Sequence, residues 1–322
     1  MRQAPQLRVV GALVAVLLAA AGTAPAWAQE TAPADTATFT GGVEAVTISA
    51  SVRDRRGRVV RDLTRAQFEV VDTGRIIDIK DVYAGESPLS LAVLLDISGS
   101  MAVGGNIERA RAAVALTTRS LEAGRDEAAL YTFDSKLQEV VPFTTEVDRL
   151  RRVSLAGRPF GTTSLYDAVA ATASQVAART NRHRAVLVIT DGMDTGSQLS
   201  ARHVSGIASS IDVPVYLLVV VNPVDHPGGP LSLVPADDGA SDTANLADLS
   251  RWTGGDMRIA SSPDHSSAAV RDLFTQLRHQ YLITFEPGAR AGWHPLEVRV
   301  KRRNLVVHAR SGYVAGSARS GS

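Results

Sequence analysis

Cysteine is absent from this chain of 322 residues. Disulfide bonds, thiolate zinc sites, cysteine nucleophiles and a lipid-modified N-terminal cysteine are therefore excluded. An excess of charge of one sign is also missing, because 34 Lys and Arg residues stand against 33 Asp and Glu. Arginine clusters such as 53–58 and 301–303 lack interleaved aromatic residues. The sequence thus offers no long-range attraction for nucleic acid or anionic lipid, and we predict neither as a partner.

Long apolar runs are equally scarce. The run from Val9 to Ala21 follows Arg2 and Arg8 and is short for the roughly 20 residues that cross a bilayer. Ala26-Trp27-Ala28 then supplies the small-x-small pattern of a cleavage site. We predict a signal peptide cleaved after Ala28, which makes the mature protein secreted or periplasmic, with no membrane span; an uncleaved anchor is the alternative.

The pattern of apolar residues changes twice along the rest of the chain. Alternation at Val46, Ile48 and Ala50 predicts short strands near the N-terminus, and similar alternation returns after His279. Between them, from Leu89, apolar strands and amphipathic helices alternate. This order predicts an α/β fold with a doubly wound, mainly parallel sheet flanked by helices. Because each β-rich segment is too small to be stable alone, we predict that the two pair in a small β-sandwich, with the α/β domain inserted between them.

The predicted domains follow from these changes. They are a signal peptide at 1–28, a flexible lead-in at 29–42, the N-terminal part of the β-sandwich at 43–88, the α/β domain at 89–279, the C-terminal part of the β-sandwich at 280–315 and a tail at 316–322.

Oxygen-bearing side chains gather where three segments of the α/β domain leave or enter the sheet. Asp96, Ser98 and Ser100 follow the first apolar strand, Thr163 precedes a helix, and Asp191 ends another apolar strand. Ligands bind at the carboxyl ends of strands in open α/β sheets, so these side chains are expected at one edge. A donor set of oxygens only suits Mg²⁺ or Mn²⁺ better than zinc or copper. We predict a metal site made of these five residues.

The same residues carry a resemblance to a known family. Asp96-Ile97-Ser98-Gly99-Ser100, the loop threonine Thr163 and the strand-end Asp191 resemble the metal-ion-dependent adhesion site of a von Willebrand factor type A (VWA) domain. The resemblance covers roughly 89–279. With the flanks, including Arg310-Ser311-Gly312-Tyr313, the chain is similar to a bacterial subgroup of secreted VWA-related proteins.

This resemblance implies a function. In the family, the serines and the threonine coordinate Mg²⁺ directly and the aspartates act partly through water; Mn²⁺ or Ca²⁺ are alternatives here. An Asp or Glu carboxylate of a partner protein completes the coordination. In integrin inserted domains the last helix shifts when ligand binds, which makes 267–279 a candidate link between the site and the β-sandwich. The sequence gives neither the partner nor the oligomeric state.

Other functions can be compared with this one. No histidine lies within a few residues of the set, and the nearby Asp167 and Asp194 are interpreted as a helix N-terminal residue and a loop residue, so we predict that the protein is not an enzyme. A structural exported module, whose metal only stabilises the fold, needs the same five residues and stays open. An aspartic protease is a remote alternative, because Asp-Thr-Gly triplets begin at Asp72 and Asp194; turn chemistry accounts for both triplets.

Overall fold

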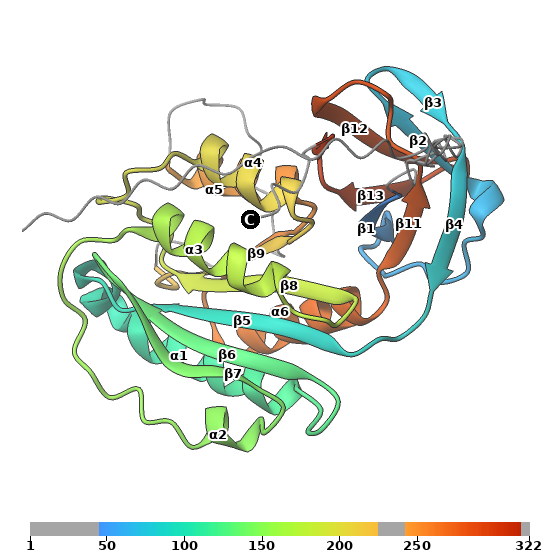
Figure 1. Ribbon diagram of the computed structural model, residues 1–322. Helices are drawn as coiled ribbons and strands as arrows, with labels where there is room; N and C mark the ends of the chain where they lie inside the picture. The colour runs from blue at the N-terminus through green and yellow to red at the C-terminus, as the bar shows by residue number, and fades with distance from the viewer. Residues whose placement is uncertain (1–44, 225–241, 317–322) are drawn as a thin grey trace, which may run out of the picture. The chain divides into compact units, whose positions relative to one another are not determined.

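The computed structural model describes residues 45–224 and 242–316 (Figure 1). The predicted signal peptide, the predicted lead-in and most of the predicted tail lie outside these residues. Within the described ranges, no helix has both the length and the apolar character needed to cross a membrane. The predicted fold class is confirmed: a mainly parallel sheet with helices on both faces is combined with two antiparallel sheets built from N- and C-terminal strands.

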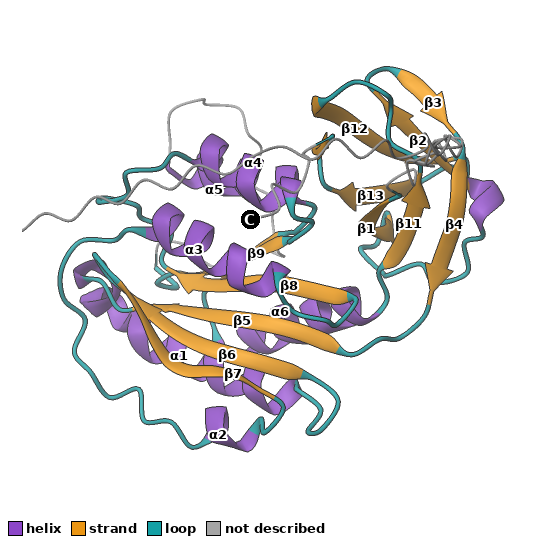
Figure 2. Ribbon diagram, viewed as in Figure 1, coloured by secondary structure: helices purple, strands orange, loops and turns teal. Residues whose placement is uncertain are grey.

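The α/β domain contains a six-stranded sheet in the order β10-β9-β8-β5-β6-β7, in which only β7 is antiparallel to its neighbour. Figure 2 shows helices on both sides of this sheet. The elements are β5 (Leu89–Asp96), the 3-10 segment η2 (Gly99–Gly105), α1 (Asn106–Ser120), β6 (Glu127–Phe133), β7 (Leu137–Thr144), α2 (Asp148–Arg151), α3 (Leu165–Ala177), β8 (His183–Thr190), α4 (Ala201–Ser210), β9 (Val215–Val220), α5 (Asp242–Thr253), β10 (Met257–Ala260) and α6 (Pro263–Arg278).

The central strand β5 is buried along its whole length because both of its faces are covered. Leu91, Val93 and Leu95 pack on the face that carries α1 and α6, while Ala92 and Leu94 pack on the face of α3, α4 and α5. Each large side chain buried in this way contributes about 1.5–3 kcal/mol. Two strongly packed faces therefore fix the position of the carboxyl end of β5.

The edge strand β7 is not predicted by the sequence pattern. Its residues include Gln138, Glu139 and Pro142, and most of its side chains are exposed or half-buried. An edge strand with one partner needs no continuous apolar pattern, and proline is tolerated there.

The remaining strands form two four-stranded antiparallel sheets around one core. Their orders are β13-β1-β11-β4 and β14-β12-β2-β3, so N-terminal strands lie beside C-terminal ones, as the blue and red ribbons of Figure 1 show. Aromatic pairs join the two sheets across the core, with ring centroids 4.9 Å apart for Phe68 and Tyr281 and 5.5 Å for Phe285 and Tyr313. The elements are β1 (Val46–Asp54), the 3-10 turn η1 (Arg65–Gln67), β2 (Phe68–Asp72), β3 (Arg75–Ile77), β4 (Ile79–Ala84), β11 (Tyr281–Phe285), β12 (Gly292–Val300), β13 (Leu305–Ala309) and β14 (Gly312–Ala315).

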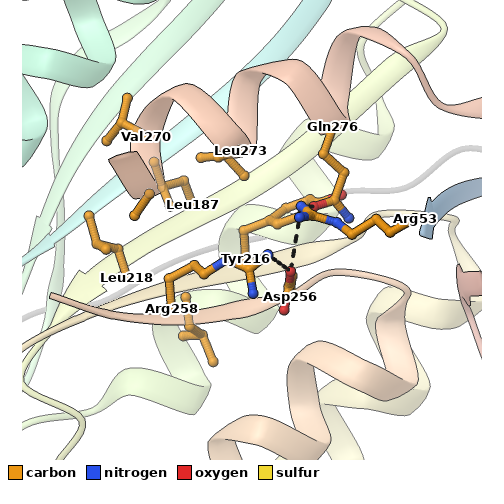
Figure 3. Close-up of a pocket in the computed structure, with 11 residues that line it drawn as sticks. Arg53, Leu187, Tyr216, Leu218, Asp256, Arg258, Val270, Leu273 and Gln276 are labelled. Atoms are coloured by element: carbon orange, nitrogen blue, oxygen red, sulfur yellow. Dashed lines mark hydrogen bonds and ion pairs between the residues drawn. The ribbon is translucent and has the colours of Figure 1, made fainter. Parts of the chain in front are cut away.

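A buried ionic network joins β1 of the sandwich to the last helix of the α/β domain. Arg53 donates to Asp272 of α6 at 2.8 Å, hydrogen-bonds Gln276 and lies 3.7 Å from Asp256. Arg258 of β10 pairs with both aspartates, at 2.7 Å for Asp256 and 2.9 Å for Asp272. In Figure 3 Arg53, Asp256, Arg258 and Gln276 lie beside a small cavity under α6. The network gives the sandwich a direct contact with the helix that precedes β11.

A second buried polar group lies inside the sandwich. His294 of β12 binds Asp72 through Nδ1 at 2.8 Å and the Arg290 carbonyl through Nε2 at 2.6 Å. Tyr313 donates to the other Asp72 oxygen at 2.8 Å. Both ring nitrogens of His294 face acceptors, so the charged imidazolium satisfies both. The bond to the Arg290 carbonyl, helped by Asp72, raises the pKa of His294. Burial opposes ionisation of Asp72, but bonds from Tyr313, His294 and Thr73 outweigh it and lower its pKa.

This arrangement predicts a pH-dependent stability. Because the pKa of His294 is raised above 6.5, its stabilising effect is fully present below about pH 6.5 and is lost as the pH rises through the raised value. Unfolding by urea between pH 5.5 and 9 should show this loss. His294→Gln should cost about 1.5–3 kcal/mol at pH 5.5 and flatten the slope. His203→Gln, at an exposed position on α4, is the control; equal slopes in wild type and His294→Gln would contradict the assignment.

Candidate metal site

The first predicted metal residues lie where β5 ends. Asp96 and Ser98 are fully buried, while Ser100 is half-buried. The Ser98 N–H donates to Asp96 Oδ1 at 2.9 Å, and the hydroxyl oxygens of Ser98 and Ser100 are 3.1 Å apart. The turn after the strand thus holds one carboxylate and two hydroxyls together, as the sequence analysis predicts for these three residues.

The neighbouring strand β8 fixes the other oxygen of this carboxylate. Thr190 donates its hydroxyl hydrogen to Asp96 Oδ2 at 2.6 Å and accepts a hydrogen bond from the Gly192 N–H at 3.0 Å. This positioning role of Thr190 is absent from the sequence analysis. The signal available there is that Thr190 directly precedes Asp191 at the end of an apolar strand.

Asp191 lies close enough to Asp96 for the two carboxylates to interact. Burial raises the pKa of Asp96 to about 6, and the charge of Asp191 acts in the same direction, against the hydrogen bonds from Thr190 and Ser98. Two carboxylates of like charge close together, one of them fully buried, are unfavourable without a cation. A divalent ion would offset this repulsion, so the chemistry of the donor set fits the metal that the sequence predicts.

The loop that carries Thr163 is bound to the first loop through its backbone. The Gly99 N–H donates to the Gly161 carbonyl at 2.9 Å, and the Phe160 N–H donates to the Ile97 carbonyl at 2.9 Å. A Cβ atom on Gly99 would lie only 3.2 Å from the Gly161 oxygen, which favours glycine at this position. Thr163 is buried, and its N–H donates to Thr195 Oγ1 at 3.0 Å in the loop that follows Asp191. The three loops that carry the predicted residues therefore meet at one edge of the sheet.

Two nearby carboxylates accept hydrogen bonds from groups of these loops and of α3. Asp194 accepts hydrogen bonds from the Leu165 N–H at 2.8 Å and from the Ser197 hydroxyl at 2.6 Å, which holds the N-terminus of α3. Asp167 accepts from the N–H groups of Gln198 and Leu199 at 3.0 and 2.9 Å. The two Asp-Thr-Gly triplets thus have local structural contacts in different domains, with Asp72 inside the sandwich and Asp194 beside α3.

The candidate site has few charges for a metal site. Within 45–224 and 242–316, no group of three or more His, Cys, Asp or Glu side chains is placed to hold a metal. The predicted set has only two carboxylates, because its other members are hydroxyls. Two ionised carboxylates would only balance the formal charge of one divalent cation, so a further anionic ligand would meet no excess of negative charge from this set.

A comparison with known protein families matches the segment that contains the candidate site to one family. The sequence profile of the von Willebrand factor type A domain family matches residues 91–193. The chain contains a VWA domain. The matched segment runs from β5 to the loop after β8 and includes Asp96, Ser98, Ser100, Thr163 and Asp191.

Solved structures with VWA-like folds are more distant. An aerotolerance-related membrane protein from Bacteroides fragilis is 20% identical, with 59% of this chain and 98% of that chain covered and a TM-score of 0.45. BatB from Bacteroides thetaiotaomicron is 18% identical, with 58% and 98% covered and a TM-score of 0.44. Proximal thread matrix protein 1 from the mussel byssus, solved with zinc in its metal-ion-dependent adhesion site, is 14% identical, with 65% and 50% covered and a TM-score of 0.47. A comparison with curated protein sequences gives no match.

Proposed function

We propose that the VWA domain is a metal-dependent protein-binding module. Asp96, Ser98, Ser100, Thr163 and Asp191 would hold Mg²⁺, with Mn²⁺ or Ca²⁺ as alternatives, and an Asp or Glu of a partner protein would bind to the metal. The observation that carries this proposal is the buried Asp96 carboxylate, which lies beside Asp191 and two hydroxyls at the carboxyl edge of the sheet. A signal peptide at 1–28, cleaved after Ala28, would direct export of the module to the periplasm or the medium.

The donor set supports binding through a carboxylate. Mg²⁺ takes about six oxygen ligands, and hydroxyl and water ligands leave its charge largely uncompensated. An anionic oxygen from a partner supplies the missing charge at an open position. The protein's own residues then orient the ion: Thr190 and the Ser98 N–H fix the two oxygens of Asp96 at 2.6 and 2.9 Å.

Binding suits this site better than bond cleavage. A metal-bound water needs a general base beside it to become a nucleophile in most hydrolytic sites. The neighbouring carboxylates Asp194 and Asp167 already accept two hydrogen bonds each from loop and helix groups. They support the loop geometry, so we propose a site that recognises a partner without transforming it.

A short peptide tests the proposal. The peptide Gly-Ser-Glu-Ser-Gly should bind the purified protein in Mg²⁺, in an NMR titration to millimolar concentration, and should lose this binding in EDTA. The matched peptide with Gln in place of Glu should bind at least about tenfold more weakly, because the neutral amide loses most of the attraction to the ion. Equal binding of the two peptides, or binding that persists in EDTA, would contradict the proposal.

The structural module remains the second candidate. It differs in one result: Mg²⁺ would raise the unfolding temperature while the Glu peptide fails to bind. Circular dichroism in EDTA is therefore measured in parallel, so that loss of binding is not confused with loss of fold.

A further inference from the structure

Large apolar side chains are exposed on each of the three loops that carry the predicted metal residues. Phe160 is 81% exposed, Val103 is 67% exposed and Met193 is 46% exposed. Phe160 lies three residues before Thr163, Val103 three residues after Ser100, and Met193 two residues after Asp191. We refer to Val103, Phe160 and Met193 as the apolar rim.

Backbone contacts bring the loops of the apolar rim together. The Phe160 N–H donates to the carbonyl of Ile97 in the first loop at 2.9 Å. A Cβ atom on Gly104, next to Val103, would lie 2.7 Å from the side chain of Asn222, so the first loop also lies close to the segment that follows β9. The third loop is attached to the second by the bond between the Thr163 N–H and Thr195 Oγ1 at 3.0 Å. The rim residues thus belong to connected loops at a single edge of the sheet (Figure 1).

The other exposed apolar residues of the described ranges lie outside these three loops. Ile76 on β3, Val140 on β7 and Ile207 on α4 are on separate elements, while Trp293 and Val314 are paired across β12 and β14. Single exposed apolar residues are common on soluble proteins, whereas a gathering around a polar centre marks an interaction surface. The apolar rim lies on the same loops as the oxygen donors of the candidate site, so both kinds of contact are available to one ligand.

We infer that the apolar rim recognises a partner segment in which the acidic residue has large apolar neighbours on both sides. This inference rests on the proposed function, because the acidic residue is placed by the metal. The charge of the cation selects the carboxylate, and the rim selects its neighbours. A small anion would contact the ion alone and leave the rim exposed to water. A protein segment can contact the cation and the apolar rim together, since the side chains on either side of its carboxylate can reach different loops.

Two peptides test this inference. In Mg²⁺, Gly-Leu-Glu-Leu-Gly should bind the purified protein about tenfold or more tightly than Gly-Ser-Glu-Ser-Gly, because each leucine transfers apolar surface from water to the rim. Phe160→Ser should reduce this ratio to nearly one while leaving the affinity for Mg²⁺ unchanged within about twofold by calorimetry. Ile76→Ser, at an equally exposed position on β3 with 69% exposure, is the matched control and should leave the ratio intact.

The outcomes separate the two proposals. Equal affinities for the leucine and serine peptides, with both lost in EDTA, would overturn the apolar rim and leave the metal-dependent function standing. Failure of both peptides to bind in Mg²⁺ would overturn the function and the rim together. Self-association in Mg²⁺ that Phe160→Ser abolishes would assign the rim to a second copy of the chain and overturn its assignment to a partner segment.

Discussion

Addition of Mg²⁺ is expected to raise the unfolding temperature of the wild-type protein, and Asp96→Ala is expected to abolish this rise. At a metal concentration about 100 times its dissociation constant, binding to the native state adds about 2.7 kcal/mol to the free energy of unfolding. For a domain of this size the shift is roughly 5–10 °C. Asp96 is central because it is buried and both of its oxygens are held by hydrogen bonds. Oδ1 accepts from the Ser98 N–H in the turn after β5, and Oδ2 accepts from the Thr190 hydroxyl on β8.

A variant that weakens metal binding without removing a metal ligand gives an intermediate result in the same measurement. Thr190→Val keeps the shape of the side chain but removes the hydrogen bond to Asp96 Oδ2. Loss of such a supporting contact typically weakens metal binding about 10–100-fold, so this variant should show a reduced shift at the same Mg²⁺ concentration. Asp78→Ala, on the exposed surface of the sandwich, should keep the full shift. A full shift in Asp96→Ala would remove this residue from the site, and no shift in the wild type would reduce the five residues to an ordinary polar turn.

The second large effect is expected at the contact between the sandwich and α6. Arg53→Met should lower the free energy of unfolding by about 3 kcal/mol, a decrease of roughly 6–12 °C in unfolding temperature. Arg53 is 5% exposed, and its loss leaves Gln276 Oε1 without the Arg53 donor and removes the ion pair of β1 with Asp272. Arg58→Met is the control, because Arg58 is 71% exposed and its ion pair with Asp54 should contribute less than about 1 kcal/mol.

The same variant tests whether α6 couples the metal site to the sandwich. Residues 267–285 include most of α6 and the strand β11, and Asp272 and Gln276 within them bind Arg53. Peptide binding in Mg²⁺ should change the hydrogen exchange of 267–285 in the wild type, and Arg53→Met should change this response. Unaltered exchange in 267–285 on binding would show that the coupling hypothesis is wrong.

Much of this fold could be predicted because its patterns are local. The apolar run of β5 and the helix–strand alternation after it follow from burial on two covered faces, which the structure confirms. The strand β7 could not be predicted in the same way, since Gln138 and Glu139 face water on an edge strand. For the candidate site, the motif identifies Asp96, Ser98 and Ser100, and the structure adds how they are held.

The sequence by itself determined the fold class, the order of the main elements apart from β7, and the chemical type of the candidate metal residues. Each of these depends on neighbours within a few positions, where periodicity and motif spacing carry the information. The tertiary structure decided that Thr190 orients Asp96, that Arg53 reaches α6 across 219 positions of sequence, and that the residues of the apolar rim are exposed on the loops of the candidate site. The physical reason is that these contacts depend on which distant segments pack together. A local pattern shows that a side chain is buried, but it does not show which distant segment buries it.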